Sequence, residues 1–420
     1  MLYSAFQKFY SALRQLEQFQ KGNNFFDNVS SLDAFFAEYR NVTFIIQKVL
    51  SHTKYKNIYE ELRDEYFVGD TISTWFVKKR NEVTKENPFQ LEKSVDIMVF
   101  SKSGIFKDSR IFTVENDEEY QSVLDSIKTY LLSFCELEVH FSVEFIYREI
   151  GREEKLFDYI SHGISNMWKF LLELGKRVTE RSELVEQLNE IIAKHPFLIA
   201  PINIYFIDDY IYFSLRGEFQ KGLTTRMFIP GWKRLPIERL GDALGIPDCM
   251  VPSDIEQYVK LFWRFVISHS ICYSMQGTIM PSFWVVYQDD TIDYVMFDFT
   301  VRTTVYRNIY EIANRISDES DIKAILYVGE TYRYRVKDKA MIAEILQVEY
   351  RKRPEKFDAL NGLLFFYLDI LGNDFYITLD DREIKNPANI LNALRNMKKG
   401  IAGSMFYMIK DAFSQKRAAG

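Results

Sequence analysis

The 420-residue chain contains little cysteine and little histidine. Its three cysteines lie far apart and form no CxxC pair, and its five histidines show neither HxH nor HxxxH spacing. The sequence therefore predicts no metal site and no disulfide framework, because these need clustered ligands or paired thiols. Isolated free thiols are typical of a reducing compartment, so we expect a cytoplasmic protein.

Long apolar runs and phosphate-binding loops are also missing. The most apolar stretch, Leu261–Ile267, is interrupted by Arg264, so we expect no membrane span and no membrane partner. The first residues show no basic patch followed by an apolar run, which predicts no signal peptide. The sequence has no Walker motif, no GxGxxG and no GxSxG, and we expect no cofactor.

Neither sign of charge dominates. The 53 Lys and Arg residues face 59 Asp and Glu residues, which gives a net charge of -6. Bulk attraction to nucleic acid is therefore not expected, and any such binding needs a local basic patch. Hydrophobic residues make up 47% of the chain, enough for real cores, and the length favours two or three domains.

Apolar residues of the first 90 positions recur at intervals of three and four, the period of an amphipathic helix. The sequence predicts a cap at Ser30 or Ser31 for one helix and at Asp70 for another, which Asn87–Pro88 ends. The apolar stripes of the four predicted helices span residues 6–16, 32–49, 58–62 and 72–83.

After residue 90 the spacing of the apolar residues changes several times. Strands are predicted at 95–100, 110–114 and 137–145, with helices over 117–134 and 153–194. Further on, Asp208–Asp209, Asp289–Asp290 and Gly372–Asp374 each separate two apolar runs, which predicts three hairpins. A capping box at Ser253–Glu256 predicts a helix start, and further helices are expected over 306–316 and after Asn386–Pro387.

These patterns predict a multidomain α+β protein, with an N-terminal helical bundle followed by a region of mixed helices and antiparallel hairpins. Strict strand–helix alternation is absent, which argues against a doubly wound parallel sheet. The expected regions are residues 1–90, 91–195 and 196–420.

One motif points toward a family. The helix that ends in Lys78–Pro88 carries Arg80–Asn81, and an earlier helix carries the segment Tyr39–Lys48. Together they resemble the helical bundle of HEPN-like proteins (higher eukaryotes and prokaryotes nucleotide-binding), in which an arginine and a polar residue precede a histidine near a helix end. The resemblance implies a homodimer that cleaves RNA without metal, with Arg80, Asn81 and Lys85 at the site. Thr84 or Lys85 holds the place of the histidine.

The chemistry of this motif is direct: an arginine holds a phosphate and stabilises developing charge, while a histidine moves a proton near neutral pH. A lysine has a reference pKa about four units higher than a histidine, so Lys85 makes a poor acid or base at a solvated helix end. We therefore expect weak or lost cleavage. The alternative interpretation is a solvated basic helix end that complements the helix dipole.

Basic residues gather in two further places. Arg333 and Arg335 alternate with tyrosines, and a C-terminal segment is rich in lysine and arginine. Both patterns are consistent with phosphate contacts and also with solvated surface or a protected edge strand. The predicted nucleic-acid-binding residues are Lys78, Lys79, Arg333, Arg335, Arg395, Lys398 and Lys399.

Two further groups of residues are better explained by core packing or turn formation than by catalysis or cation binding. His269 and Cys272 lie one turn apart, but their apolar surroundings favour core packing. Asp289, Asp290, Asp293 and Asp298 supply oxygen ligands of the kind that divalent cations bind, yet adjacent aspartates usually form turns.

Three functional hypotheses follow. The first is a HEPN-like module of a bacterial-type stress or defence protein that binds RNA or a nucleotide. The second is a non-catalytic protein that dimerises and docks a protein partner. The third is an enzyme with a carboxylate site in the C-terminal half.

Overall fold

The computed structural model divides the chain into two compact units. Unit 1 comprises residues 1–102 and 107–226, and unit 2 comprises residues 103–106 and 227–420. The structure describes residues 2–115, 118–178, 182–199, 202–221, 227–228, 234–237, 250–297, 302–334, 336–348, 356–401 and 403–419. The fold is α+β, as the sequence predicts. No helix in the described ranges is long and apolar enough to cross a membrane.

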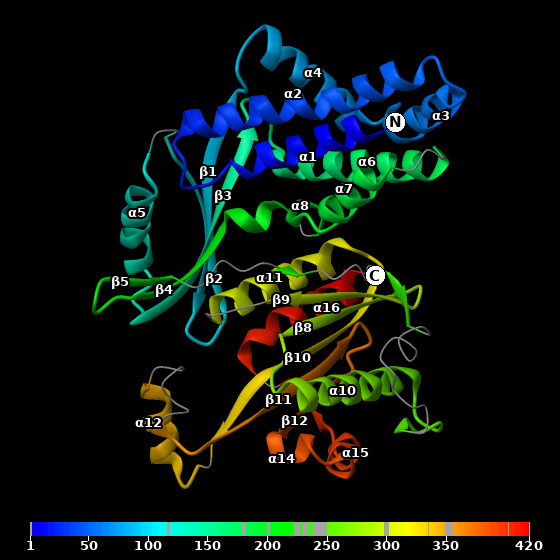
Figure 1. Cartoon of the computed structure of the whole chain (residues 1–420). Helices are drawn as coiled ribbons and strands as arrows, with labels where there is room; N and C mark the ends of the chain where they lie inside the picture. The colour runs from blue at the N-terminus through cyan, green and yellow to red at the C-terminus, as the bar shows by residue number, and fades with distance from the viewer. Residues whose placement is uncertain are drawn as a thin grey trace. The chain divides into compact units, whose positions relative to one another are not determined.

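The N-terminal helices of unit 1 follow the predicted order. They are α1 (Tyr3–Glu17), α2 (Phe25–Leu50), α3 (Lys56–Phe67) and α4 (Thr71–Lys85). The side chain of Asp70 accepts hydrogen bonds from the first-turn amides of α4, which confirms the predicted cap. In Figure 1, α1 and α2 lie side by side in blue, and both contribute to one core.

A distant segment completes this bundle. Helix α6 (Leu156–Arg177) packs against α3 and α4, and the hydroxyl of Tyr39 donates a hydrogen bond to the carbonyl of Gly163 at 2.8 Å. A Cβ at Gly163 would overlap the ring of Phe76, so only glycine allows this close approach. The predicted bundle therefore includes residues 156–177 as well as the first 90.

The sheet of unit 1 has the strand order β2-β1-β3-β4-β5. Strands β1 and β3, β3 and β4, and β4 and β5 pair antiparallel. Alternate residues of β3 from Val139 to Tyr147 enter the same core as the helices. The bounds are β1 (Leu91–Ser101), β2 (Phe106–Thr113), α5 (Tyr120–Leu132), β3 (Glu138–Glu149), α7 (Glu183–Ala193), α8 (Pro196–Ile199), the 3-10 helix η1 (Ile202–Phe206), β4 (Ile207–Phe213) and β5 (Glu218–Lys221).

Unit 2 is a sheet covered by helices on both faces. Side chains of one strand face, such as Trp284 and Leu326, pack with α10, whereas the alternating residues Phe283 and Ile325 pack with α11 and α16. The strand order is β13-β12-β11-β10-β8-β9-β6, with β7 paired to β9. The bounds are β6 (Met227–Phe228), β7 (Leu235–Pro236), α10 (Gln257–Gln276), β8 (Ser282–Tyr287), β9 (Thr291–Phe297), α11 (Arg302–Asp318), β10 (Ile322–Tyr334), α12 (Lys339–Gln347), β11 (Ala359–Asp369), β12 (Asp374–Asp380), α14 (Asp381–Ile384), α15 (Pro387–Arg395), β13 (Lys398–Lys399), the 3-10 helix η4 (Ser404–Phe406) and α16 (Tyr407–Ala419).

Two of the three predicted hairpins are present. Strands β8 and β9 flank Asp289–Asp290, and β11 and β12 flank a turn in which Gly372 has a φ of 90°. The first prediction was wrong, because residues 202–206 form η1 and Asp208–Asp209 lie inside β4. Both aspartates are buried, and ionic and hydrogen-bonding partners elsewhere in unit 1 compensate for their burial.

Three helix boundaries also differ from prediction. Helix α2 begins at Phe25 under an Asn24 cap, so Ser31 lies inside the helix and donates its hydroxyl to the carbonyl of Asp27. Helix α10 begins at Gln257 without a capping box, and a capping box occurs instead at Asp380–Glu383. The single helical region expected over 153–194 contains two helices, α6 and α7.

Candidate nucleic-acid interface

Helix α4 holds Arg80 close to its C-terminal end. The Asp70 carboxylate accepts hydrogen bonds from the amides of Ile72 and Ser73 at 3.3 and 3.0 Å, which fixes the start of the helix. The amide of Glu86 closes the last turn on the carbonyl of Glu82 at 2.8 Å, ahead of Asn87–Pro88. Arg80 therefore projects from a helix whose two ends are defined by the local sequence.

A second arginine shares a ring with Arg80. Helices α2 and α4 pack together, as the blue part of Figure 1 shows. The guanidinium carbon of Arg40 lies 4.3 Å from the centre of the Phe44 ring, and that of Arg80 lies 5.4 Å from the same centre. Two residues that are 40 positions apart in the chain thus place their positive charges around one half-exposed phenylalanine.

These two charges have only neutral partners within the described residues. A terminal nitrogen of Arg40 donates to the Thr43 hydroxyl, and one of Arg80 donates to the Asn81 side-chain oxygen at 3.2 Å. The Nε atom of Arg80 is buried and has no hydrogen-bond partner in the described part of the chain. No carboxylate of the described residues forms an ion pair with either guanidinium.

The electrostatic result is a pair of like charges. Burial lowers the pKa of Arg40, and the positive charge of Arg80 lowers it further, against an opposing effect of Tyr59. The shift leaves Arg40 charged, because the ordinary pKa of an arginine lies far above neutral pH. An anion placed between them would relieve this repulsion, and a phosphate group matches the fork of N–H donors.

The two neighbouring lysines have internal partners instead. The Lys79 side chain is buried and its ammonium pairs with the carboxylates of Glu82 and Glu149, while the ammonium of Lys78 lies 3.7 Å from Glu82. The Lys79–Glu149 ion pair joins α4 to β3, and the carboxylate offsets the charge of Lys79 within the fold. Lys78 is exposed and extends the basic surface of α4 beyond Arg80.

The other predicted catalytic positions bring no proton carrier to Arg80. Asn81 and Lys85 are exposed on the same helix. The Thr84 hydroxyl donates to the carbonyl of Arg80 at 2.7 Å, so it is bound to its own helix. Of these residues, Asn81 contacts the Arg80 guanidinium through its side chain.

The remaining predicted contacts lie in unit 2. Arg395, Lys398 and Lys399 are exposed at the end of α15 and in β13. Arg333 lies in β10, paired in register with Leu360, and Arg335 lies outside the described residues. Other basic residues of the C-terminal segment bind within unit 2: Lys410 contacts Asp374, and Lys416 and Arg417 donate to backbone carbonyls.

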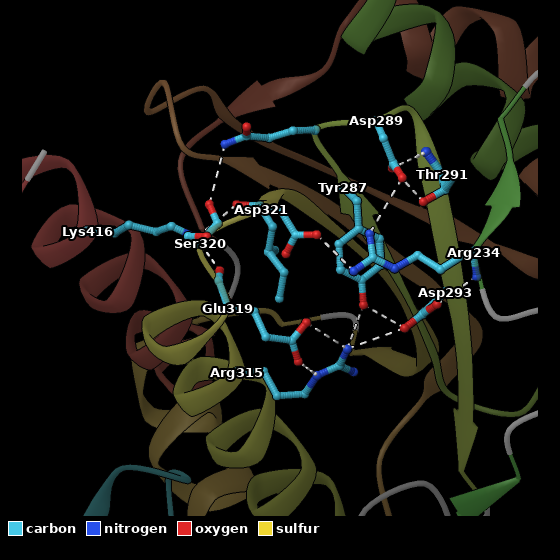
Figure 2. Close-up of polar contacts among 12 residues, drawn as sticks. Arg234, Tyr287, Asp289, Thr291, Asp293, Arg315, Glu319, Ser320, Asp321 and Lys416 are labelled. Atoms are coloured by element: carbon cyan, nitrogen blue, oxygen red, sulfur yellow. Dashed lines mark hydrogen bonds and ion pairs between the residues drawn. The ribbon is translucent and has the colours of Figure 1, made fainter. Parts of the chain in front are cut away.

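A second arginine cluster surrounds Tyr287, and Figure 2 shows its contacts. The Arg234 guanidinium carbon lies 3.2 Å from the centre of the Tyr287 ring, and Arg315 donates to the Tyr287 hydroxyl at 2.7 Å. That hydroxyl donates to Asp293 at 2.6 Å. Ion pairs join these arginines to carboxylates, namely Arg315–Glu319 at 2.9 Å and Arg234–Asp321 at 2.8 Å.

This network accounts for the aspartates that resemble a cation site. Asp289 accepts from the amide and hydroxyl of Thr291, which is turn geometry, and Asp290 pairs with Lys323. Asp293 is bound by Tyr287 and Arg315, and Asp298 lies outside the described residues. No group of ligands suited to a metal ion occurs among the described residues.

His269 and Cys272 do not form a pair. The buried imidazole of His269 donates through Nδ1 to the carbonyl of Phe265 at 2.8 Å. Burial lowers the pKa of His269 to about 4, so this histidine is neutral at pH 7. The predicted core packing is confirmed for His269 but was wrong for Cys272, which is exposed.

No protein-family model, curated protein or solved structure matches this chain. Sequence reasoning included Arg80 and Asn81 but omitted Arg40 and Phe44 as site residues. A local signal for them existed, because Arg40 and Phe44 are four residues apart and share a helix face, but no pattern in the sequence placed that face beside Arg80.

Proposed function

We propose that unit 1 binds single-stranded RNA through the guanidiniums of Arg40 and Arg80 and does not cleave it. The observation that carries this proposal is the pair of like charges around Phe44, which no carboxylate of the described residues offsets. The HEPN-like resemblance supports RNA as the polyanion. The net charge of -6 favours a local contact over general attraction to nucleic acid.

Phosphate oxygens are the groups that such a cluster recognises. A guanidinium held over an aromatic ring keeps N–H groups at its edge, where they donate to two oxygens of one phosphate. Phe44 then acts as a positioning residue, because its ring limits the orientations of both arginines. Contacts of this kind bind the backbone and read no base sequence.

The absence of cleavage follows from proton transfer. RNA cleavage needs a group that removes a proton from the attacking hydroxyl and another that protonates the leaving oxygen. An arginine stabilises negative charge but is a poor proton donor or acceptor near neutral pH, and the Thr84 hydroxyl is bound to its own helix. The proposed site therefore has the phosphate-binding groups expected of a HEPN-like protein and lacks a group that transfers protons.

The test is binding and cleavage of a labelled single-stranded RNA of about 20 nucleotides, without added metal. We expect the protein to bind, and the Arg40→Ala and Arg80→Ala variants each to bind about tenfold more weakly, because each loses a charge-assisted contact of about 1.5 kcal/mol. No RNA is cleaved in any sample.

The matched control is Arg177→Ala. Arg177 lies in the same unit but pairs with Glu61 and Glu173, so its loss removes an equal charge from outside the cluster. We expect this variant to bind RNA within about twofold of the parent. Equal weakening by all three substitutions would assign binding to bulk charge, and no binding by the parent protein would leave the protein-docking hypothesis in its place.

A further inference from the structure

Unit 1 also contains a pocket that the RNA proposal does not use. Its volume is about 720 Å³, within the range of small-molecule sites. The end of α1 and the turn after it form one wall, and α6, α8, η1 and β5 supply the others. Five elements from three parts of the chain, namely α1, α6 and the segment from α8 to β5, thus converge on one cavity.

Aromatic rings make up most of the apolar wall. Phe19, Phe157 and Phe206 are buried and pack together, with ring centres 5.0 Å apart for Phe19–Phe157 and 4.4 Å apart for Phe157–Phe206. Phe197 and Tyr205 are half-buried and lie edge-to-face at 5.5 Å. Such a wall favours a flat aromatic ligand, because edge-to-face and offset contacts between rings are stabilising.

Two lysines bring positive charge to the same pocket. Lys21 and Lys221 both line it, and both ammonium groups meet the same Oδ1 atom of the buried Asp208, at 2.8 and 3.1 Å. Burial lowers the pKa of Lys21, and Asp208 opposes that shift. The Lys221 side chain is 45% exposed.

The acidic residue of the pocket is already paired. Glu17 pairs with Arg14, and its Oε1 lies 3.2 Å from Nε2 of His195. Nδ1 of His195 accepts from the amide of Phe197 at 3.3 Å, which leaves the proton of the neutral ring on Nε2, facing Glu17. Arg14 and His195 thus engage the carboxylate of Glu17, while Lys21 and Lys221 share one oxygen of Asp208.

From this arrangement we infer that the pocket binds a small ligand with a planar aromatic body and one anionic group, a carboxylate or a phosphate. The half-buried rings of Phe197 and Tyr205 contact the aromatic body, and Lys221 contacts the anion. This inference concerns a site that shares no residue with the Arg40–Phe44–Arg80 cluster, so either proposal can fail without the other.

The probes are 1-naphthyl phosphate, 1-naphthoate, 1-naphthol and inorganic phosphate, measured by naphthalene fluorescence or by calorimetry on the full chain. We expect one of the two anionic naphthalenes to bind at least about tenfold more tightly than 1-naphthol, because a charge-assisted contact is worth about that factor. Inorganic phosphate alone binds more weakly still. The tighter of the two anionic probes identifies the anionic group.

Two variants assign the contacts. Lys221→Met keeps the length of a half-exposed side chain and removes the charge, and should bring the anionic probes to the affinity of 1-naphthol. Phe197→Ala should weaken all three naphthalenes together. The control is Lys176→Met, since Lys176 is exposed and paired with Glu173 outside the pocket, and should change nothing. Circular dichroism confirms that each variant is folded.

The inference is overturned if 1-naphthol binds as tightly as both anionic probes, if Lys221→Met leaves their advantage intact, or if no naphthalene saturates the parent protein at millimolar concentration.

Discussion

Each unit of this protein places two arginines beside one aromatic ring, and the two clusters differ in what surrounds them. In unit 1, Arg40 and Arg80 lie over Phe44 and contact only neutral oxygens among the described residues. In unit 2, the arginines at Tyr287 pair with aspartate and glutamate side chains (Figure 2). We infer from this difference that the second cluster stabilises the fold, while the first, as proposed above, binds an external anion.

The physical reason lies in the cost of a buried charge. In unit 2, burial opposes the charge of Arg315, but contacts with Glu319, Tyr287 and Asp293 raise its pKa overall. In unit 1, burial and the like charge of Arg80 both lower the pKa of Arg40. One cluster is electrostatically satisfied within the fold and the other is not, and groups with perturbed pKa values are common at functional sites.

The largest effect is expected for Arg315→Ala. This change leaves Asp293 and Glu319 without their cation and the Tyr287 hydroxyl without a donor, so we expect a loss of about 2 kcal/mol in the free energy of unfolding. Urea denaturation measures it. Arg315→Lys restores part of the loss, because the charge returns without the fork geometry.

RNA binding should not respond to that change. If Arg315→Ala bound RNA more weakly at a temperature where it stays folded, the two clusters would share one function and the contrast between them would be wrong.

The next largest effect is expected from adding a carboxylate to the Arg40–Phe44–Arg80 cluster. Asn81→Asp puts a carboxylate where Arg80 already donates to the Asn81 oxygen at 3.2 Å. We expect RNA affinity to fall about fivefold, because the new charge competes with phosphate, and stability to rise by less than about 1 kcal/mol, since the pair is exposed. Fluorescence anisotropy and urea denaturation measure the two quantities. Unchanged RNA affinity would show that Arg80 does not contact the backbone.

The smallest effect is expected for Phe44→Leu. Leucine keeps the apolar volume but removes the ring, and a cation–π contact at a half-exposed site is worth about 0.5–1 kcal/mol. RNA affinity should fall about threefold while the salt dependence stays constant, because both charges remain. A loss as large as that of Arg80→Ala would instead make Phe44 a direct contact.

Two elements that depend on neighbouring residues were predicted correctly. Helix α4 follows the expectation because Asp70 and Pro88 act within one turn of its ends. The β8–β9 hairpin was predicted for the same reason, since Asp289 accepts a hydrogen bond from the amide of Thr291, two residues later.

What depends on distant residues was missed or misinterpreted. Asp208 was predicted in a turn, because adjacent aspartates between apolar runs are typical of turns. It is instead buried in β4, where the ammonium groups of Lys21, 187 positions earlier, and of Lys221 offset its charge. The meeting of Arg40 with Arg80 and the closure of the bundle by α6 likewise depend on how whole helices pack.

The central claim is that Arg40 and Arg80 contact RNA phosphates, and the salt dependence of binding tests it most directly. Each phosphate contact with single-stranded nucleic acid contributes about 0.7 to the slope of log K against log salt concentration. The Arg40→Ala/Arg80→Ala double variant should therefore lose about 1.4 from that slope relative to the parent, while Arg177→Ala keeps it. An unchanged slope in the double variant would contradict the account.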